Sequence, residues 1–218
     1  MSLLAFPNLQ ESLAETVRSA LIDYESLGTL LRSCDLKKCR GMCCHDGVFL
    51  GAEEKGVLAA EFGGENFEVS GKRWRTKRRR AKDSELAVNF PSHFPRTRCY
   101  FLDEKDFCKL QVAAVEQGHE PWYWKPVPCW LHPLSFYQDR ETGRPVLVLP
   151  QEGKDPQGKS GYPGFASCTT CGLADCDPQA KPAYEVLADE LNFLGQIGSR
   201  EILEEVRTYF AEPSQTYL

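Results

Sequence analysis

Ten cysteines constrain the fold of this 218-residue chain more than any other feature of its sequence. They lie in three groups along the chain: Cys34, Cys39, Cys43 and Cys44; Cys99, Cys108 and Cys129; Cys168, Cys171 and Cys176. A lone cysteine is usually a small buried apolar side chain, whereas grouped cysteines are typical of metal sites, disulfides or redox-active thiols. The grouping therefore indicates chemistry at these thiols. For Cys34, at the end of a predicted helix, packing against the core without a metal is an equally good explanation.

Metal binding is favoured over disulfide bonding for these cysteines. A chain of this length with 42% hydrophobic residues can build a core without cross-links. Its start lacks a basic leader and the apolar stretch of roughly 7–15 residues that marks a secretory signal. No apolar run approaches the roughly 20 residues of a membrane-spanning helix. We therefore expect a cytoplasmic protein outside the membrane, where reducing conditions leave thiols free to bind metal.

The spacing of the cysteines predicts more than one metal site. Four thiolates complete a tetrahedral zinc site or bind an iron–sulfur cluster, so cysteines distant in sequence should combine. Because Cys43 and Cys44 are adjacent, their side chains diverge, and a single ion is not expected to bind both. We expect the first group to share its sites with the second group, namely Cys99, Cys108 and Cys129.

The third cysteine group predicts part of another site. Cys168 and Cys171 have the two-residue spacing that lets one turn present two thiolates to one ion, and Gly172 would relieve the tight backbone. Cys176 is a candidate third ligand.

Two histidines are candidate additional ligands, because imidazole can complete a coordination shell that lacks a thiolate. His45 follows Cys44 directly, and His132 comes three residues after Cys129.

The pattern of apolar residues predicts a single α+β domain, an irregular cysteine-rich fold stapled by metal, with small antiparallel hairpins and long N- and C-terminal helices. We expect an amphipathic helix over residues 8–31, capped by Asn8 and Glu11. The rest divides into a core metal-binding region (34–133), a hairpin with the last cysteine group (134–180) and C-terminal helices (182–211). Within the core region we expect a helix over 52–62, a short strand near 87–90, a hairpin over 98–110, a helix over 109–117 and, because of four prolines, no helix over 121–133.

Three sequence elements resemble a known family. They are the run Lys38-Cys39-Arg40-Gly41-Met42-Cys43-Cys44, the segment Cys99-Tyr100-Phe101-Leu102-Asp103 with Cys108, and Lys125-Pro126-Val127-Pro128-Cys129-Trp130-Leu131-His132-Pro133. In this order they resemble the YkgJ-like, or CxxCxxCC, family of zinc- or iron-chelating proteins, and the last cysteine group resembles an uncharacterised bacterial branch of it. The first cysteine spacing departs from the family pattern, which leaves Cys34 the least secure ligand.

The resemblance implies metal chelation and leaves the reaction open. A distant branch resembles flagellin lysine N-methylases that are thought to use an iron–sulfur cluster, which implies cluster-dependent modifying or redox activity. Thiolate ligands accept both zinc and iron–sulfur clusters, so the ligand type does not separate the two. The sequence contains no Gly-x-Ser-x-Gly, Walker A, Gly-x-Gly-x-x-Gly or His-Glu-x-x-His motif that would indicate a common enzyme class.

A basic run over residues 72–82, from Lys72 to Lys82, supports an alternative function. It carries eight positive charges and contains Trp74, although the whole chain has a net charge of −5. Arginines bind phosphate and an aromatic ring can stack on a base, so a structural zinc module could contact nucleic acid or an acidic protein here. A solvated face is the simpler interpretation of such a run.

Overall fold

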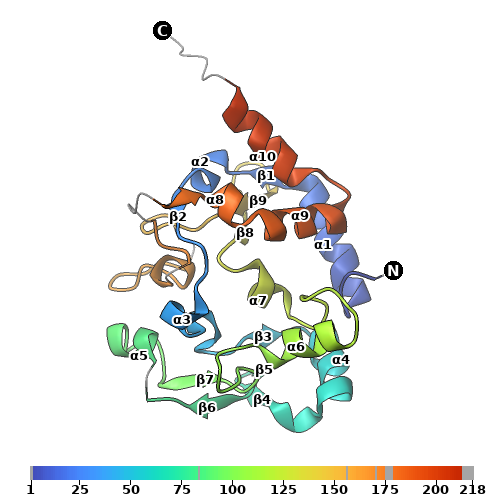
Figure 1. The fold of residues 1–218 in the computed structure, drawn as a ribbon, viewed down its shortest axis with the longest axis vertical. Helices are drawn as coiled ribbons and strands as arrows, with labels where there is room; N and C mark the ends of the chain where they lie inside the picture. The colour runs from blue at the N-terminus through green and yellow to red at the C-terminus, as the bar shows by residue number, and fades with distance from the viewer. Residues whose placement is uncertain (1, 83, 156, 170, 175–178, 213–218) are drawn as a thin grey trace.

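The computed structural model describes residues 2–82, 84–155, 157–169, 171–174 and 179–212. Helices and small, mostly antiparallel sheets confirm the expected α+β class. Figure 1 shows helices and small sheets in both the upper and the lower half of the molecule, with α7 (Val127–Leu131) between the halves. The upper half contains the β1-β9-β8 sheet and the two-stranded β2–β10 sheet.

The upper half is built around α1 (Pro7–Ser19), which packs against α9 (Ala188–Gly198). Its three-stranded sheet has the order β1-β9-β8, in which β1 is parallel to β9 and β8 is antiparallel. The strands of this sheet are β1 (Leu21–Ile22), β8 (Ser135–Gln138) and β9 (Pro145–Val148). The remaining elements of the upper half are α2 (Tyr24–Leu27), β2 (Leu30–Leu31), β10 (Lys181–Pro182), α8 (Ala183–Val186) and α10 (Ile202–Ala211). The hairpin and the C-terminal helices expected from the sequence are thus present.

The lower half contains an antiparallel sheet of order β3-β5-β4 and a two-stranded sheet of β6 and β7. Its elements are β3 (Phe49–Leu50), α4 (Ala52–Phe62), β4 (Phe67–Ser70), β5 (Arg73–Thr76), β6 (Arg78–Arg80), α5 (Glu85–Asn89), β7 (Thr97–Cys99) and α6 (Lys109–Glu116). A single helical turn, α3 (Leu36–Cys39), leads into this half from above. The helices expected over 52–62 and 109–117 are confirmed.

The prediction of one long N-terminal helix over residues 8–31 is wrong. α1 ends at Ser19, and Ala20 is extended, with ψ 141°. The chain then forms β1, where pairing of Leu21 and Ile22 with β9 replaces the helical hydrogen bonds. Tertiary pairing therefore overrides the helical spacing of apolar residues over the second part of this segment.

The start of α1 is capped from the other half of the molecule. Glu53, in the first turn of α4, accepts hydrogen bonds through Oε1 from the Asn8 backbone N–H (3.0 Å) and through Oε2 from that of Leu9 (2.8 Å). The cap expected from Asn8 and Glu11 is wrong, because the helix begins at Pro7 and Asn8 itself is bound by Glu53. This carboxylate satisfies free backbone donors and lies at the positive end of the helix dipole.

Three further local expectations differ from the structure. Residues 87–90 are largely helical, in α5, because Ser84 caps the helix by accepting from the Ala87 N–H. Residues 121–133 contain α7, since Pro128 occupies a first-turn position that needs no N–H donor. The hairpin over 98–110 is reduced to one bridge between Leu102 and Cys108, because β7 pairs with β6 instead.

The buried core joins both halves. Its largest fully buried side chains include Trp130 of α7, Leu58 of α4 and Leu194 of α9. Within the described residues, no helix combines the length and apolar character needed to cross a membrane.

Candidate metal centre

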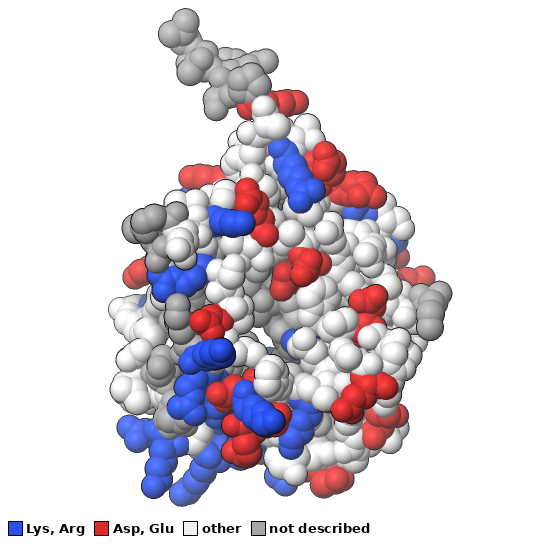
Figure 2. All heavy atoms as spheres, viewed as in Figure 1, with Lys and Arg blue, Asp and Glu red and all other residues white. Residues whose placement is uncertain are grey.

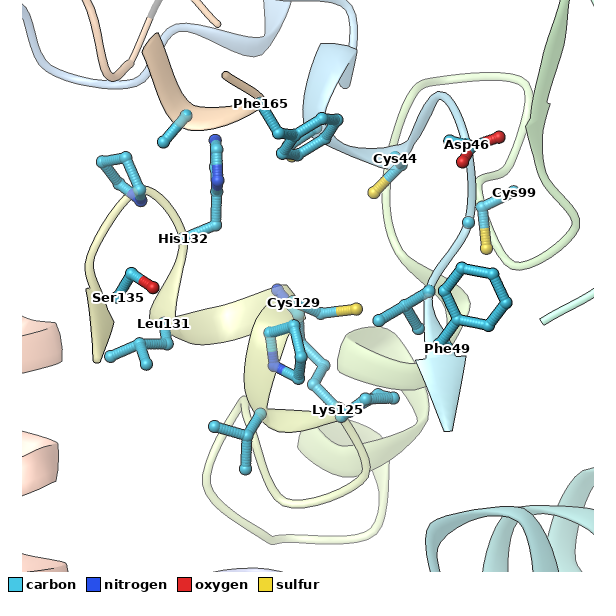
Figure 3. A pocket seen from close by; sticks show the side chains of 18 of the residues that line it. Cys44, Asp46, Phe49, Cys99, Lys125, Cys129, Leu131, His132, Ser135 and Phe165 are labelled. Carbon is cyan, nitrogen blue, oxygen red and sulfur yellow. The ribbon is translucent and has the colours of Figure 1, made fainter. Parts of the chain in front are cut away.

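A cavity of about 570 Å³ lies next to α7, and five of the ten cysteines line it: Cys43, Cys44, Cys99, Cys108 and Cys129. Figure 3 shows the thiols of Cys44 and Cys129 directed into the space between α7 and the segment that leads into β3. His132 and Phe165 lie at the other end of this space. The cavity thus collects cysteines from sequence groups that are far apart.

Four of these cysteines, Cys44, Cys99, Cys108 and Cys129, form what we call the cavity set. Burial raises the pKa of the Cys129 thiol well above its usual range, and the nearby thiols of Cys108 and Cys99 raise it further. The Cys44 pKa is also raised well above its usual range, first by its hydrogen bond with Cys43, then by burial and by the same two neighbours. Such mutual effects require the four thiols to be close neighbours.

Short local structures bring the cavity set together. Cys44 ends a 3₁₀ turn that begins after Gly41, where φ is +68° and a side chain would crowd Leu102. Cys108 directly precedes α6, and its bridge to Leu102 holds it near β7, which ends at Cys99. The remaining member, Cys129, lies in the middle of α7.

A second group of thiols, Cys34, Cys39, Cys43 and Cys171, forms what we call the knuckle set. Burial raises the pKa of Cys171 to about 12, and Cys43, Cys34 and Cys39 add to the rise. The pKa of Cys34 is raised to about 11 by burial and then by Cys39, with which it shares a hydrogen bond, and by Cys43. The last cysteine group therefore reaches the first one through Cys171.

The adjacent residues Cys43 and Cys44 lie where the two sets meet. Cys43 influences Cys34 and Cys171 of the knuckle set, but it also influences Cys129 and lines the cavity. Cys44 is influenced by Cys99 and Cys108. The two thiols share one hydrogen bond, which lowers the pKa of Cys43 to about 7.

Cys168 lies apart from both sets. It packs in a small cluster with Tyr162, to which it is hydrogen-bonded, and its Sγ donates to the Phe165 carbonyl (3.3 Å). Thr169, which follows, is extended with ψ 144°, and Cys168 is not among the thiols that raise the pKa of Cys171. The expectation that one turn presents both thiols to one ion stays a prediction. Cys176 lies outside the described residues.

The two candidate histidines have different surroundings. His45 is buried, hydrogen-bonded to Ser84 and in edge contact with Phe94, and it does not line the cavity. His132 does line it, and its Nε2 lies 2.9 Å from Oγ1 of Thr169. Burial, followed by the charge of Lys125, lowers the pKa of His132 to about 4, so its ring is neutral.

Two charged residues near the thiols, Lys125 and Glu190, were not predicted as site residues from the sequence. Lys125 lines the cavity, and its charge favours the thiolate forms of Cys43 and Cys129. Its only side-chain hydrogen bond within the described residues is from Nζ to Oε1 of Gln111, at 3.2 Å. Glu190 of α9 lies near Cys34, and burial raises its own pKa. The signal for Lys125 was present as the basic residue before Pro126 in the third resembled element.

The thiols form two neighbourhoods without closing into a coordination shell. Within the part of the chain that the structure describes, no three Cys, His, Asp or Glu side chains are arranged to hold a metal ion as they stand. All nine described cysteines are free thiols. Metal binding by either set would require its thiols to move together.

The cavity is large enough to hold many water molecules. A space of about 570 Å³ with polar groups in its lining is filled by water or by a bound group.

The basic run of residues 72–82 is partly used inside the protein. Arg75 is buried and pairs with Asp46 (3.2 Å), and Arg78 pairs with Asp46 (3.2 Å) and Glu68 (3.1 Å). Arg79 pairs with Glu104 at 3.0 Å. Five exposed cations of the run lie outside these pairs: Lys72, Arg73, Lys77, Arg80 and Lys82. Figure 2 shows basic side chains gathered at the lower left of the molecule, over β6 in Figure 1.

Comparison with protein-family models, curated proteins and solved structures finds no match to this chain. The resemblance to the CxxCxxCC family therefore stays a prediction from the three sequence elements, and the thiol sets have to be interpreted from their own geometry.

Proposed function

We propose that this protein binds metal at two thiolate centres, one in the cavity set and one in the knuckle set. The observation that carries the proposal is the gathering of eight cysteines into two neighbourhoods that meet at the adjacent residues Cys43 and Cys44. Four thiolates are the complete ligand complement of a structural zinc ion or an iron–sulfur cluster.

The cavity set favours a centre that does more than hold the fold. A structural zinc site is closed on all sides by protein, whereas these cysteines border a cavity that extends to His132. An iron–sulfur cluster would supply electron transfer or radical chemistry there. In such a centre, Lys125 would offset part of the negative charge of the thiolates around the cluster. We therefore favour iron–sulfur for the cavity set, with cluster-dependent modifying or redox activity, and zinc as its alternative.

Thiolate centres of this kind fit a protein of a reducing compartment, the cytoplasm. The nine described cysteines are free, and thiols in this number survive oxidation only where the cell keeps them reduced or metal-bound.

Metal analysis of single-cysteine variants tests the proposal. The protein is purified without oxygen, and its iron, zinc and sulfide are measured together with its visible absorption. Cys99→Ser should lose the cavity-set metal, Cys39→Ser the knuckle-set metal, and the double variant both. Cys168→Ser is the matched control, because Cys168 lies outside both sets and should be dispensable for metal binding. Metal-free wild-type protein, or unchanged metal content in Cys99→Ser, would contradict two thiolate centres.

A structural zinc module with a basic contact surface is the second candidate. The five exposed cations of residues 72–82 take no part in the internal ion pairs formed by Arg75, Arg78 and Arg79. Single-stranded nucleic acid bound by them should dissociate as salt rises. Nucleic-acid affinity that does not fall as the salt concentration rises would contradict this candidate, as would a protein that contains iron and sulfide instead of zinc.

A further inference from the structure

The cavity extends well beyond the thiols of the cavity set. Figure 3 shows Cys44, Cys99 and Cys129 on one side of the cavity and His132 on the other, and Asp155 and Tyr162 also line it. A metal ion bound by four thiolates fits between their sulfur atoms and would leave most of this volume open. The volume is typical of small-molecule sites, which commonly measure about 300–1,000 Å³.

The lining of the cavity is mainly apolar and aromatic. Five phenylalanines take part in it: Phe49, Phe94, Phe101, Phe136 and Phe165. Apolar walls of this kind bind an organic molecule better than they bind water.

The charged groups of the cavity already have partners. Asp46 is paired with Arg75 and Arg78. Asp155 accepts hydrogen bonds from Oγ of Ser167 (3.0 Å) and from the backbone N–H of Gln157 (2.8 Å).

The one lysine of the cavity, Lys125, faces thiols. It lies near Cys43 and Cys129, whose thiolates would balance it in the proposed centre; this step rests on the proposed function. No cation of the cavity lining is then left to receive an anionic ligand.

His132 offers the cavity one hydrogen-bond acceptor. The Thr169 hydroxyl donates its proton to the Ala166 carbonyl (2.9 Å), so Oγ1 of Thr169 accepts from Nε2–H of His132. In a neutral ring the proton on Nε2 leaves a lone pair on Nδ1. No hydrogen-bond donor for this Nδ1 is found within the described residues.

We propose that the cavity binds an uncharged, largely apolar small molecule with one hydroxyl or N–H donor, held beside the cavity set with its donor on Nδ1 of His132. The aromatic wall packs against the body of the molecule, and the lining has no unpaired cation that would hold an anion. The ligand thus lies next to the proposed metal centre, as a substrate of that centre would.

Two fluorescent probes with the same aromatic frame test the ligand class. N-phenyl-naphthylamine is uncharged and has one N–H donor, and anilinonaphthalene sulfonate adds a negative charge to that frame. The neutral probe should bind one-to-one and saturably, and the sulfonate should bind at least about tenfold more weakly, because its charge has no partner in the cavity. Equal or tighter binding of the sulfonate would overturn the uncharged class.

Two cavity variants locate the probe, each with the same substitution elsewhere as its control. Ala166→Leu fills part of the cavity and should weaken binding by about tenfold or more, whereas Ala60→Leu, on the exposed surface of α4, should leave it unchanged. His132→Phe keeps the ring shape and removes the acceptor, which should weaken binding about threefold to tenfold. His119→Phe, outside the cavity, should bind as the wild type does. Near-ultraviolet circular dichroism shows that each variant is folded.

The outcomes separate this inference from the proposed function. No saturable binding of the neutral probe by folded protein, or wild-type binding by a folded Ala166→Leu variant, overturns the cavity ligand whatever the metal content. Metal analysis of the same sample decides the proposed function separately, because metal-free protein that binds the probe would contradict only the thiolate centres.

Discussion

Lys125 stands between the two thiol sets, since its charge acts on Cys43 in one and on Cys129 in the other. Removing it should weaken metal binding at both centres. We expect Lys125→Met to lower metal affinity about tenfold to a hundredfold, and Lys125→Arg to retain most of it. Competition with a coloured chelator measures the affinity. Equal affinities of the wild type and Lys125→Met would show that the lysine does not balance the thiolates.

Glu54 gives a pH dependence that is separate from the thiols. Burial raises its pKa, and the Gly51 N–H bound to Oε2 (2.8 Å) only partly opposes the rise. The folded state therefore holds the proton of Glu54 more tightly than the unfolded state, and the resulting stability is lost as pH rises above about 4.5 through the folded pKa. Glu54→Gln removes this loss. Relative to the wild type, its free energy of unfolding should improve from pH near 4.5 to neutral pH, measured by urea unfolding. A constant difference would contradict the raised pKa.

At the scale of elements, the contact of α1 with α9 depends on glycine. A methyl group at Gly198 would meet the side chain of Val17, with 2.7 Å to its Cβ. We expect Gly198→Ala to lower the free energy of unfolding by about 2 kcal/mol.

Gly56 is the matched control for that substitution. It lies in α4 with no atom near the added methyl group, so Gly56→Ala should raise stability by about 0.5–1 kcal/mol. Equal effects at the two positions would show that helix propensity, and not the contact, sets the cost.

Arg200 ends α1 from a distant part of the chain. Its Nη1 donates to the carbonyls of Val17 (2.9 Å) and Ala20 (2.7 Å), while Nε and Nη2 bind Glu205. Arg200→Met should cost about 2–3 kcal/mol, because charge-assisted hydrogen bonds are lost. Arg207→Met should change stability by less than about 0.5 kcal/mol, since its pair with Glu204 is long (3.9 Å) and exposed. Chemical denaturation of both variants checks the contrast.

These contacts show which elements the sequence could predict. α4 and α6 follow from local spacing and first-turn residues, and the β8–β9 hairpin follows from its turn. The end of α1 does not, because β9 and Arg200, more than 120 residues away, decide it. α7 was missed because proline in the first turn of a helix is tolerated, and a count of prolines does not locate the turn.

At the scale of the whole molecule, two metal centres would tie distant segments together. The knuckle set joins the segment before α3 to the loop after Cys168, and the cavity set joins β7, α6 and α7. Removal of metal by a chelator should therefore destabilise the entire fold. Metal at about a thousand times its Kd contributes about 4 kcal/mol, so the melting temperature should fall by about 10 °C for a chain of this size.

The variant that lacks both centres is the control for this experiment. A chelator should leave the melting temperature of the Cys39→Ser, Cys99→Ser double variant unchanged. If the chelator leaves the melting temperature of the wild type unchanged as well, the thiols do not stabilise the fold through metal.

The candidate site could be predicted in part. The grouping of the cysteines follows from the sequence. The expected separation of Cys43 from Cys44 stays a prediction, because Cys43 lies near both Cys171 and Cys129 and lines the same cavity as Cys44. That Cys171 joins the first group while Cys168 packs against Tyr162 could not be predicted, because the spacing between two cysteines does not fix the backbone between them. The cavity itself has no sequence signal, since its wall comes from many separate segments.

The adjacency of Cys43 and Cys44 has a consequence for how two centres would fill. Their Cα atoms are separated by one peptide unit, about 3.8 Å, so the two bound groups would share a rigid amide plane as their link. Binding at one centre would fix the orientation of that plane before the second centre fills. Uptake of metal would then be sequential and cooperative, with the first ion preparing the site of the second.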